Sequence, residues 1–183
     1  MKRTDLRTAY GRLGIWPGDM GPQEADIIFT EAMKCRDGAT FLEINPQGGR
    51  TTAILGTAAK NLGGKLYVAS DPTKTNHEEQ LWLGRAITLH GLRGITSILA
   101  DTANPTIRAA MNGSGLDFVL LNGDFARTDF LPINVGTVVV QRKSSADVKR
   151  AEKMVDARPA ISVWRITEEQ PGPELTVIDG GKI

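Results

Sequence analysis

Acidic and polar side chains follow several short apolar segments of this sequence, in positions where they could bind a polar ligand. In chain order, these residues are Glu43, Asp71, Asp101 with Thr102, and Asn122 with Asp124. Carboxylate groups accept hydrogen bonds from sugar hydroxyl groups and attract cations. Ligands of open α/β sheets bind beyond the carboxyl ends of the strands. If the apolar segments are parallel strands, these side chains meet at one edge of a sheet.

A turn with the sequence NPQGG follows the strand that carries Glu43. Because Gly48 and Gly49 have no Cβ atom, the backbone can approach a ligand closely there. The dinucleotide-binding pattern G-x-G-x-x-G is absent, since Asn45 stands where its first glycine would be. Asparagine tolerates left-handed backbone geometry, so the turn itself can be kept.

Asp71 and Glu43 together indicate what kind of ligand this edge would bind. Asp71 lies 22 residues beyond Gly49, about the distance at which an acid after the second strand of a dinucleotide-binding fold reaches the ribose. A carboxylate as close as Glu43 repels a pyrophosphate and attracts an ammonium or sulfonium group. The sequence therefore favours a ligand with a nucleoside and a cationic group over a dinucleotide.

Short apolar segments alternate with segments of helical periodicity along most of the chain. Strands are predicted at 41–44, 66–69, 95–100, 118–121 and 138–140, and helices at 22–37, 51–62, 76–90, 104–113 and 144–158. Apolar strands separated by helices indicate a parallel sheet that is covered on both faces. The last two predicted strands, 161–167 and 175–178, are too close for a helix between them and predict an antiparallel hairpin. The expected fold is an α/β, doubly wound, mostly parallel seven-stranded Rossmann-like sheet with a C-terminal antiparallel hairpin.

Length and composition indicate one domain and disfavour several classes of partner. The chain has 183 residues, enough for one core, so 22–183 is predicted as a single domain after an N-terminal arm at 1–21. A formal net charge of +1 argues against a nucleic-acid-binding protein. No apolar run reaches the roughly 20 residues of a membrane span. The single cysteine, Cys35, fits a reducing compartment, so a cytoplasmic protein is expected.

The two histidines of the chain are too few to predict a zinc site. His90 stands at the end of the helix predicted at 76–90, where a protonated imidazole would interact favourably with the helix dipole. It is therefore expected to be a structural cation and not a site residue.

The motifs around the candidate site residues occur in the order found in a known family. The stretches LEINPQGGRTTAIL, LYVASDP, ITSILADT and DFVLLNGD, together with the seven predicted strands, resemble the class I S-adenosylmethionine-dependent methyltransferases. The first stretch is similar to the first-strand motif of the branch that contains small-molecule O-methyltransferases. The resemblance covers about Ala39 to Ile178.

This resemblance implies S-adenosylmethionine as the cofactor and gives each candidate residue a role. Glu43 and the turn of Asn45, Gly48 and Gly49 would hold the methionine portion. The ribose would be bound by Asp71, and the adenine by Asp101 with Thr102. Asn122 would lie near the transferred methyl group.

The fourth motif and the fifth strand depart from the metal-dependent members of that branch. Those members typically place a metal-binding aspartate at the end of the fourth strand and further ligands after the fifth. Here the corresponding residues are Asn122, Gln141 and Arg142. Amides and an arginine are poor ligands for a hard divalent cation. No catalytic metal is therefore expected, and Asp124 is the acid left in place as a candidate general base.

Three functions follow as hypotheses. The first is methyl transfer from S-adenosylmethionine to a small-molecule acceptor, whose pocket would be built by the N-terminal arm and 124–132; this leaves open a homodimer in which a partner subunit completes the pocket. The second is a non-catalytic protein that binds S-adenosylmethionine or a nucleoside and serves as a binding or interaction module, as the changed fourth motif suggests. The third is a nicotinamide- or nucleotide-binding oxidoreductase of related topology, which the missing glycine pattern disfavours.

Overall fold

The protein forms a seven-stranded sheet with the strand order β3-β2-β1-β4-β5-β7-β6. The computed structural model describes residues 4–12, 20–70, 76–99, 107, 110–111, 115–123, 133–142, 151–157 and 161–167. The strands are β1 (Thr40–Ile44), β2 (Lys65–Ala69), β3 (Thr96–Leu99), β4 (Leu116–Asn122), β5 (Ile133–Arg142), β6 (Ala151–Ala157) and β7 (Ile161–Ile166). Neighbours from β3 to β5 pair in parallel, and β7 pairs antiparallel with both β5 and β6. The predicted α/β fold, with a mostly parallel seven-stranded sheet and an antiparallel hairpin, is confirmed.

The composition of the hairpin differs from the prediction. Residues 151–157 form β6 and pair with β7, so the helix predicted at 144–158 is wrong over this segment. The register of the β6–β7 pairing shifts between Lys153 and Val155. This irregularity interrupts the alternation of side chains typical of a strand, so the periodicity of the sequence does not indicate a strand there. Pairing with β7 therefore outweighs a weak helical pattern. The strand predicted at 175–178 lies outside the described residues.

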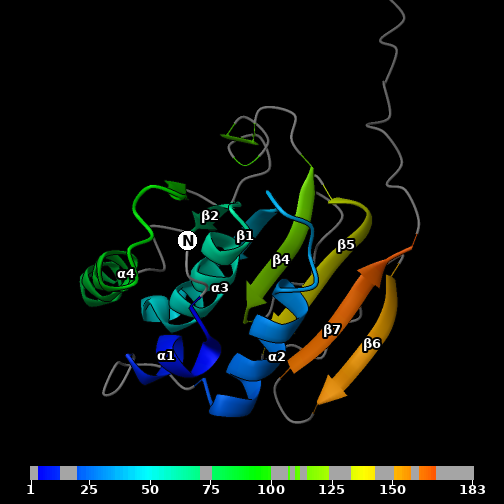
Figure 1. Cartoon of the computed structure of the whole chain (residues 1–183), viewed down its shortest axis with the longest axis horizontal. Helices are drawn as coiled ribbons and strands as arrows, with labels where there is room; N and C mark the ends of the chain where they lie inside the picture. Colours follow the sequence, from blue (N-terminus) through cyan, green and yellow to red (C-terminus); the bar gives the residue numbers. More distant parts are fainter. Residues whose placement is uncertain are drawn as a thin grey trace, which may run out of the picture.

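Four helices cover one face of the sheet. They are α1 (Leu6–Gly11), α2 (Pro22–Ala32), α3 (Arg50–Asn61) and α4 (His77–Leu89). In Figure 1, α4 lies at one side of the molecule and the β6–β7 hairpin at the other. None of the helices among the described residues combines the length and the apolar character needed to cross a membrane.

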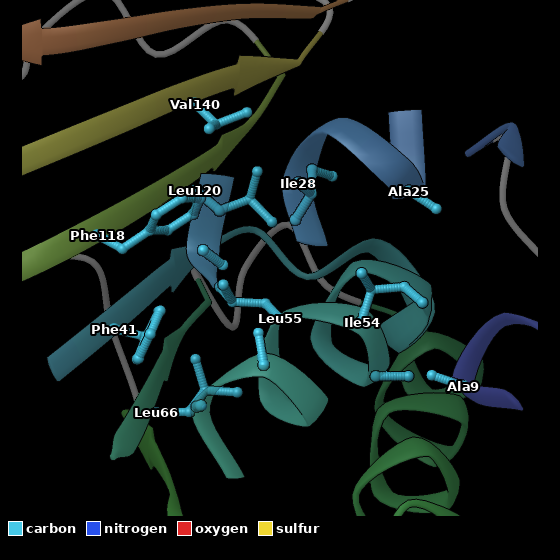
Figure 2. Packing of buried hydrophobic residues seen from close by; sticks show 14 of the residues in the cluster. Ala9, Ala25, Ile28, Phe41, Ile54, Leu55, Leu66, Phe118, Leu120 and Val140 are labelled. Carbon is cyan, nitrogen blue, oxygen red and sulfur yellow. The ribbon is translucent and has the colours of Figure 1, made fainter. Parts of the chain in front are cut away.

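Two apolar cores lie on opposite faces of the sheet. Figure 2 shows the core beneath the helices, where Ile28 of α2 and Leu55 of α3 contribute to the same cluster as Phe118 of β4. The other core contains Ile107 and Met111, which are helical, in the segment predicted as a helix at 104–113. Helical residues on both faces are what the doubly wound prediction requires.

The N-terminal arm contains a docked helix that the sequence did not predict. The side chain of Asp5 caps α1 by accepting a hydrogen bond from the backbone N–H of Thr8. Ala9 is fully buried against the core. Thr4 and Asn61 exchange two hydrogen bonds, which fix the start of the arm to the end of α3. A helix of six residues is too short for its periodicity to be recognised in the sequence.

His90 is a buried neutral side chain, and its prediction as a structural cation is wrong. It forms the C-cap of α4 but is only 5% exposed, and its Nε2 atom has no hydrogen-bond partner. Burial lowers the pKa of His90 to about 4, and the nearby cations Arg12 and Lys60 act in the same direction. At neutral pH the ring therefore carries no charge.

We expect the buried His90 to make the fold sensitive to acid. The unfolded chain binds a proton at this residue below about pH 6.5, whereas the folded chain binds it only near about pH 4. Stability is therefore lost as the pH falls through this interval and changes little from this cause above it. Thermal melts should show that the Tm falls by several degrees between about pH 6.5 and about pH 4. The variant His90→Gln should make this fall in Tm smaller. His77→Gln, at the exposed start of α4, is the matched control and should leave the decrease unchanged.

Candidate functional site

The chain turns sharply between β1 and α3, in the loop that carries the predicted glycines. Asn45 and Gln47 have positive φ angles of 57° and 44°, and Gly48 and Gly49 follow at 79° and 85°. Left-handed geometry at a non-glycine residue costs on the order of 1–3 kcal/mol, and such residues cluster at ligand-binding sites. Asn45 adopts the left-handed geometry that asparagine tolerates, and its N–H donates to the carbonyl of Ala69 at the end of β2.

Gly49 has a packing role that needs no ligand. A Cβ atom built at this residue would lie 2.9 Å from Cβ of Ala86 and 3.0 Å from Cα of Leu83. The absence of a side chain therefore lets α4 pack directly on the loop. Ligand contact by Gly48 and Gly49 stays a prediction.

A comparison of the variants Gly49→Ala and Gly38→Ala should separate the cost of lost packing from the cost of backbone strain. Gly49→Ala introduces a Cβ atom at φ +85° and against α4, so we expect it to lower the free energy of unfolding by about 2–3 kcal/mol. Gly38→Ala is the matched control, because φ is +74° there but nothing lies within 4 Å of the added Cβ. It should cost about 1 kcal/mol. Equal losses in urea denaturation would show that α4 does not depend on close approach to Gly49.

Glu43 is completely buried and is held by three side chains. The hydroxyl group of Thr51 donates to Oε1, and that of Thr52 donates to Oε2 at 2.5 Å. The amide of Asn122 donates to Oε1 at 3.1 Å. Burial raises the pKa of Glu43, while the hydrogen bonds from Thr51, Thr52 and Asn122 and the charge of Arg142 oppose the rise.

These hydrogen bonds connect the end of β1 to the start of α3. Thr51 and Thr52 lie in the first turn of α3, where the positive end of the helix dipole also favours a carboxylate. Through these hydrogen bonds, Glu43 connects the two ends of the 45–49 loop. Its predicted contact with a cofactor stays a prediction.

Asn122 and Arg142 extend this buried network to the neighbouring strands. Arg142 donates through Nη1 to Oδ1 of Asn122 at 3.0 Å, which orients the amide so that its Nδ2 atom faces Glu43. Through Nε and Nη2, the same guanidinium reaches both carboxylate oxygens of Glu24 on α2, at 3.3 Å and 3.2 Å. Residues from α2, β1, α3, β4 and β5 thus form one network beneath the carboxyl edge of the sheet.

The remaining predicted site residues, Asp71, Asp101, Thr102 and Asp124, lie outside the described residues. The register nevertheless fixes where the chain leaves the neighbouring strands. Ile44 pairs with Ala69, and Ala69 pairs with Leu99, so β1, β2 and β3 end side by side. The segments that begin after β2 and β3 therefore start at the edge that holds Glu43. The binding roles of these four residues stay predictions.

Sequence reasoning did not find Glu24, Thr51 and Thr52 and gave Arg142 no role. The sequence contains a pattern that points to the two threonines, because they begin a predicted helix directly after a glycine turn. It also contains one that points to Glu24, whose carboxylate accepts a hydrogen bond from the N–H of Gly21 in a capping box at the start of α2. The pairing of Glu24 with Arg142 spans 118 residues of sequence and has no local signal.

The described part of the chain contains no group of three or more His, Cys, Asp or Glu side chains that could hold a metal ion. Asn122 is engaged by Arg142 and Glu43, and it is only 1% exposed. Metal independence stays a prediction.

Comparisons with known proteins support the fold. No protein-family model and no curated protein matches the sequence. Among solved structures, cofactor-bound Rv0187 from MTB superposes with a TM-score of 0.62 and 14% identity over 90% of this chain and 88% of that chain. A methyltransferase from Geobacter sulfurreducens gives 0.61 and 9%, over 92% of this chain and 99% of that chain. An O-methyltransferase from Bacillus cereus in complex with SAH gives 0.56 and 15%, over 87% and 88%. The chain therefore has the fold of the class I S-adenosylmethionine-dependent methyltransferases.

Proposed function

We propose that this protein binds S-adenosylmethionine at the carboxyl edge of its sheet and transfers the methyl group to a small-molecule acceptor without a metal ion. The observation that supports this most strongly is the loop at 45–49, in which four of the five residues have positive φ angles and which buried Glu43 ties to the start of α3. This loop joins the central strand β1 to α3 at the edge where open α/β sheets bind ligands. Solved proteins of the same fold are bound to SAM or SAH.

The residues of the loop suit a nucleoside with an amino-acid portion. Asn45, Gly48 and Gly49 would present backbone groups to the methionine portion, and buried Glu43 and Asn122 would hold the loop in shape. In the proposal, Asp71 binds the ribose and Asp101 with Thr102 binds the adenine. The bound cofactor supplies an electrophilic methyl group on a sulfonium centre.

Catalysis would rest mainly on holding the acceptor in line with that methyl group. Such positioning can contribute about 7–11 kcal/mol in well-oriented reactions. Asp124 would remove a proton only where the acceptor, such as a hydroxyl group, has to lose one. The acceptor pocket would include the N-terminal arm and 124–132, with a homodimer as the assembly that could complete it. Action in the cytoplasm belongs to the same proposal.

One observation favours a second candidate, a non-catalytic protein that binds the same ligand. The polar group at the end of β4, Asn122, has its amide oxygen bound by Arg142 and its amide nitrogen bound to Glu43. Because both ends of its amide are engaged in these hydrogen bonds, Asn122 has little hydrogen-bonding capacity left for an acceptor molecule. Turnover on a panel of hydroxyl, amine and thiol acceptors would separate the two candidates, and unchanged turnover in EDTA is expected of the first.

Thermal melts with candidate ligands test the proposed ligand directly. S-adenosylhomocysteine at 100 times its Kd should add about 2.7 kcal/mol, which corresponds to a Tm increase of about 5–10 °C for a domain of this size. NAD at the same concentration should give no increase. A shift with NAD and none with S-adenosylhomocysteine would favour the oxidoreductase and overturn the proposal.

A further inference from the structure

Among the described residues, the buried network at the carboxyl edge contains two carboxylates and one guanidinium. The side chain of Arg142 is 2% exposed and that of Glu24 is 15% exposed, and the two make a two-pronged ion pair. Glu43 is completely buried. Because Glu24 already balances the charge of Arg142, an ionised Glu43 would leave the three charged groups of the network that the structure describes with a net charge of −1.

The groups that face Glu43 from each neighbouring element compensate such a charge only in part. From α3 come two hydroxyl groups and the positive end of the helix dipole, and from β4 comes the neutral amide of Asn122. β2 places apolar Val68 beside Glu43. The charged pair of Glu24 on α2 and Arg142 on β5 is linked to Glu43 through the amide of Asn122, and the charge of Arg142 acts on it from there. Burial accordingly raises the pKa of Glu43.

The same geometry can hold Glu43 with or without a proton. The hydroxyl oxygen of Thr52 lies 2.5 Å from Oε2. A hydroxyl group donates a hydrogen bond to an ionised carboxylate and accepts one from a protonated carboxyl group. Protonation of Glu43 therefore requires no movement of the loop or of α3.

We propose that Glu43 is a proton-linked charge sensor, which releases its proton to solvent when the sulfonium donor binds and keeps it when the thioether product binds. This inference rests on the proposed function. A sulfonium bound at the loop two residues beyond Glu43 supplies the positive charge that the network lacks, and charges in a buried site are weakly screened. The product S-adenosylhomocysteine has the same amino, carboxyl and nucleoside groups but a neutral sulfur. Loss of the sulfonium charge on methyl transfer would thus let Glu43 take up one proton from solvent and return to its protonated form.

Calorimetric titration in buffers of different ionisation enthalpy measures the protons released. We expect S-adenosylmethionine to release up to one proton more than S-adenosylhomocysteine at pH values where free Glu43 is protonated. At those pH values, affinity for the donor should rise by up to about tenfold per pH unit relative to the product. Because the two ligands differ only at the methylated sulfur, the difference cancels proton release by their shared groups.

Two variants test whether the difference in proton release between the two ligands comes from this network. Glu43→Gln cannot release a proton, so the two ligands should behave alike. Glu24→Gln leaves the charge of Arg142 available to Glu43, which should ionise Glu43 in the free protein and shrink the difference. The Glu24 variant keeps the test decisive if Glu43→Gln does not fold. Both ligands binding with equal proton release, or a difference that persists in Glu43→Gln, would overturn the sensor alone. Absence of binding by either ligand would overturn the proposed function and the sensor with it.

Discussion

Replacing Arg142 with methionine is expected to lower the free energy of unfolding by about 3–5 kcal/mol, because it removes one partner of a buried ion pair. The variant leaves the carboxylate of Glu24 without its guanidinium and removes the hydrogen bond to Oδ1 of Asn122. A buried polar group without its partner keeps its full desolvation cost. Urea denaturation of the wild type and the variant measures the loss.

Arg36→Met is the matched control for this prediction. Arg36 also pairs with a carboxylate, that of Asp117 at 2.8 Å, but its side chain is 70% exposed. Exposed pairs contribute about 0–1 kcal/mol, so this variant should lose no more than that. A loss for Arg142→Met as small as that of the control would contradict the description of a buried network.

Replacing Asp71 with alanine is expected to weaken binding of S-adenosylhomocysteine by about 100-fold or more. In the proposed site, this carboxylate accepts hydrogen bonds from both ribose hydroxyl groups. Hydrogen bonds to a charged group contribute about 1.5–3 kcal/mol each, and about 2.7 kcal/mol corresponds to a 100-fold change in Kd. Calorimetric titration gives the Kd of each protein.

Asp37→Ala is the control for the Asp71 variant. Asp37 is an exposed acid that precedes β1, at the opposite end of the strand from the 45–49 loop. Its removal should leave the Kd unchanged, and both variants should keep the Tm of the wild type within a few degrees. Unaltered affinity in Asp71→Ala would show that the ribose is bound elsewhere.

The central part of the fold was predictable because its local signals agree. The strand containing Phe41 is mostly apolar and is followed by a glycine turn, and the helix after it has regular apolar spacing. Such agreement between pattern and turn chemistry is what makes a segment predictable. The prediction failed for β6, because this segment becomes a strand by pairing with β7 across a register shift. It also failed for α1, because these six residues form a helix that depends on docking against α3.

The candidate site was predictable at the level of residue position and not at the level of contacts. The place of Glu43 at the end of a strand followed from the local sequence, and the left-handed geometry of Asn45 is one that the sequence allowed. The hydrogen bond between Glu43 and Asn122 did not follow from the local sequence, because Asn122 lies 79 residues away in the sequence. The engagement of both carboxylate oxygens by protein donors suggests that Glu43 shapes the loop and tunes charge, which is a different role from direct ligand contact.

A crystal structure of the protein with S-adenosylhomocysteine would test the central claim most directly. We predict density for the ligand over the 45–49 loop, with its ribose within hydrogen-bonding distance of Asp71 and its sulfur on the side of Asn122. Density at another place, or an edge filled by the protein's own side chains with no ligand bound, would contradict the claim.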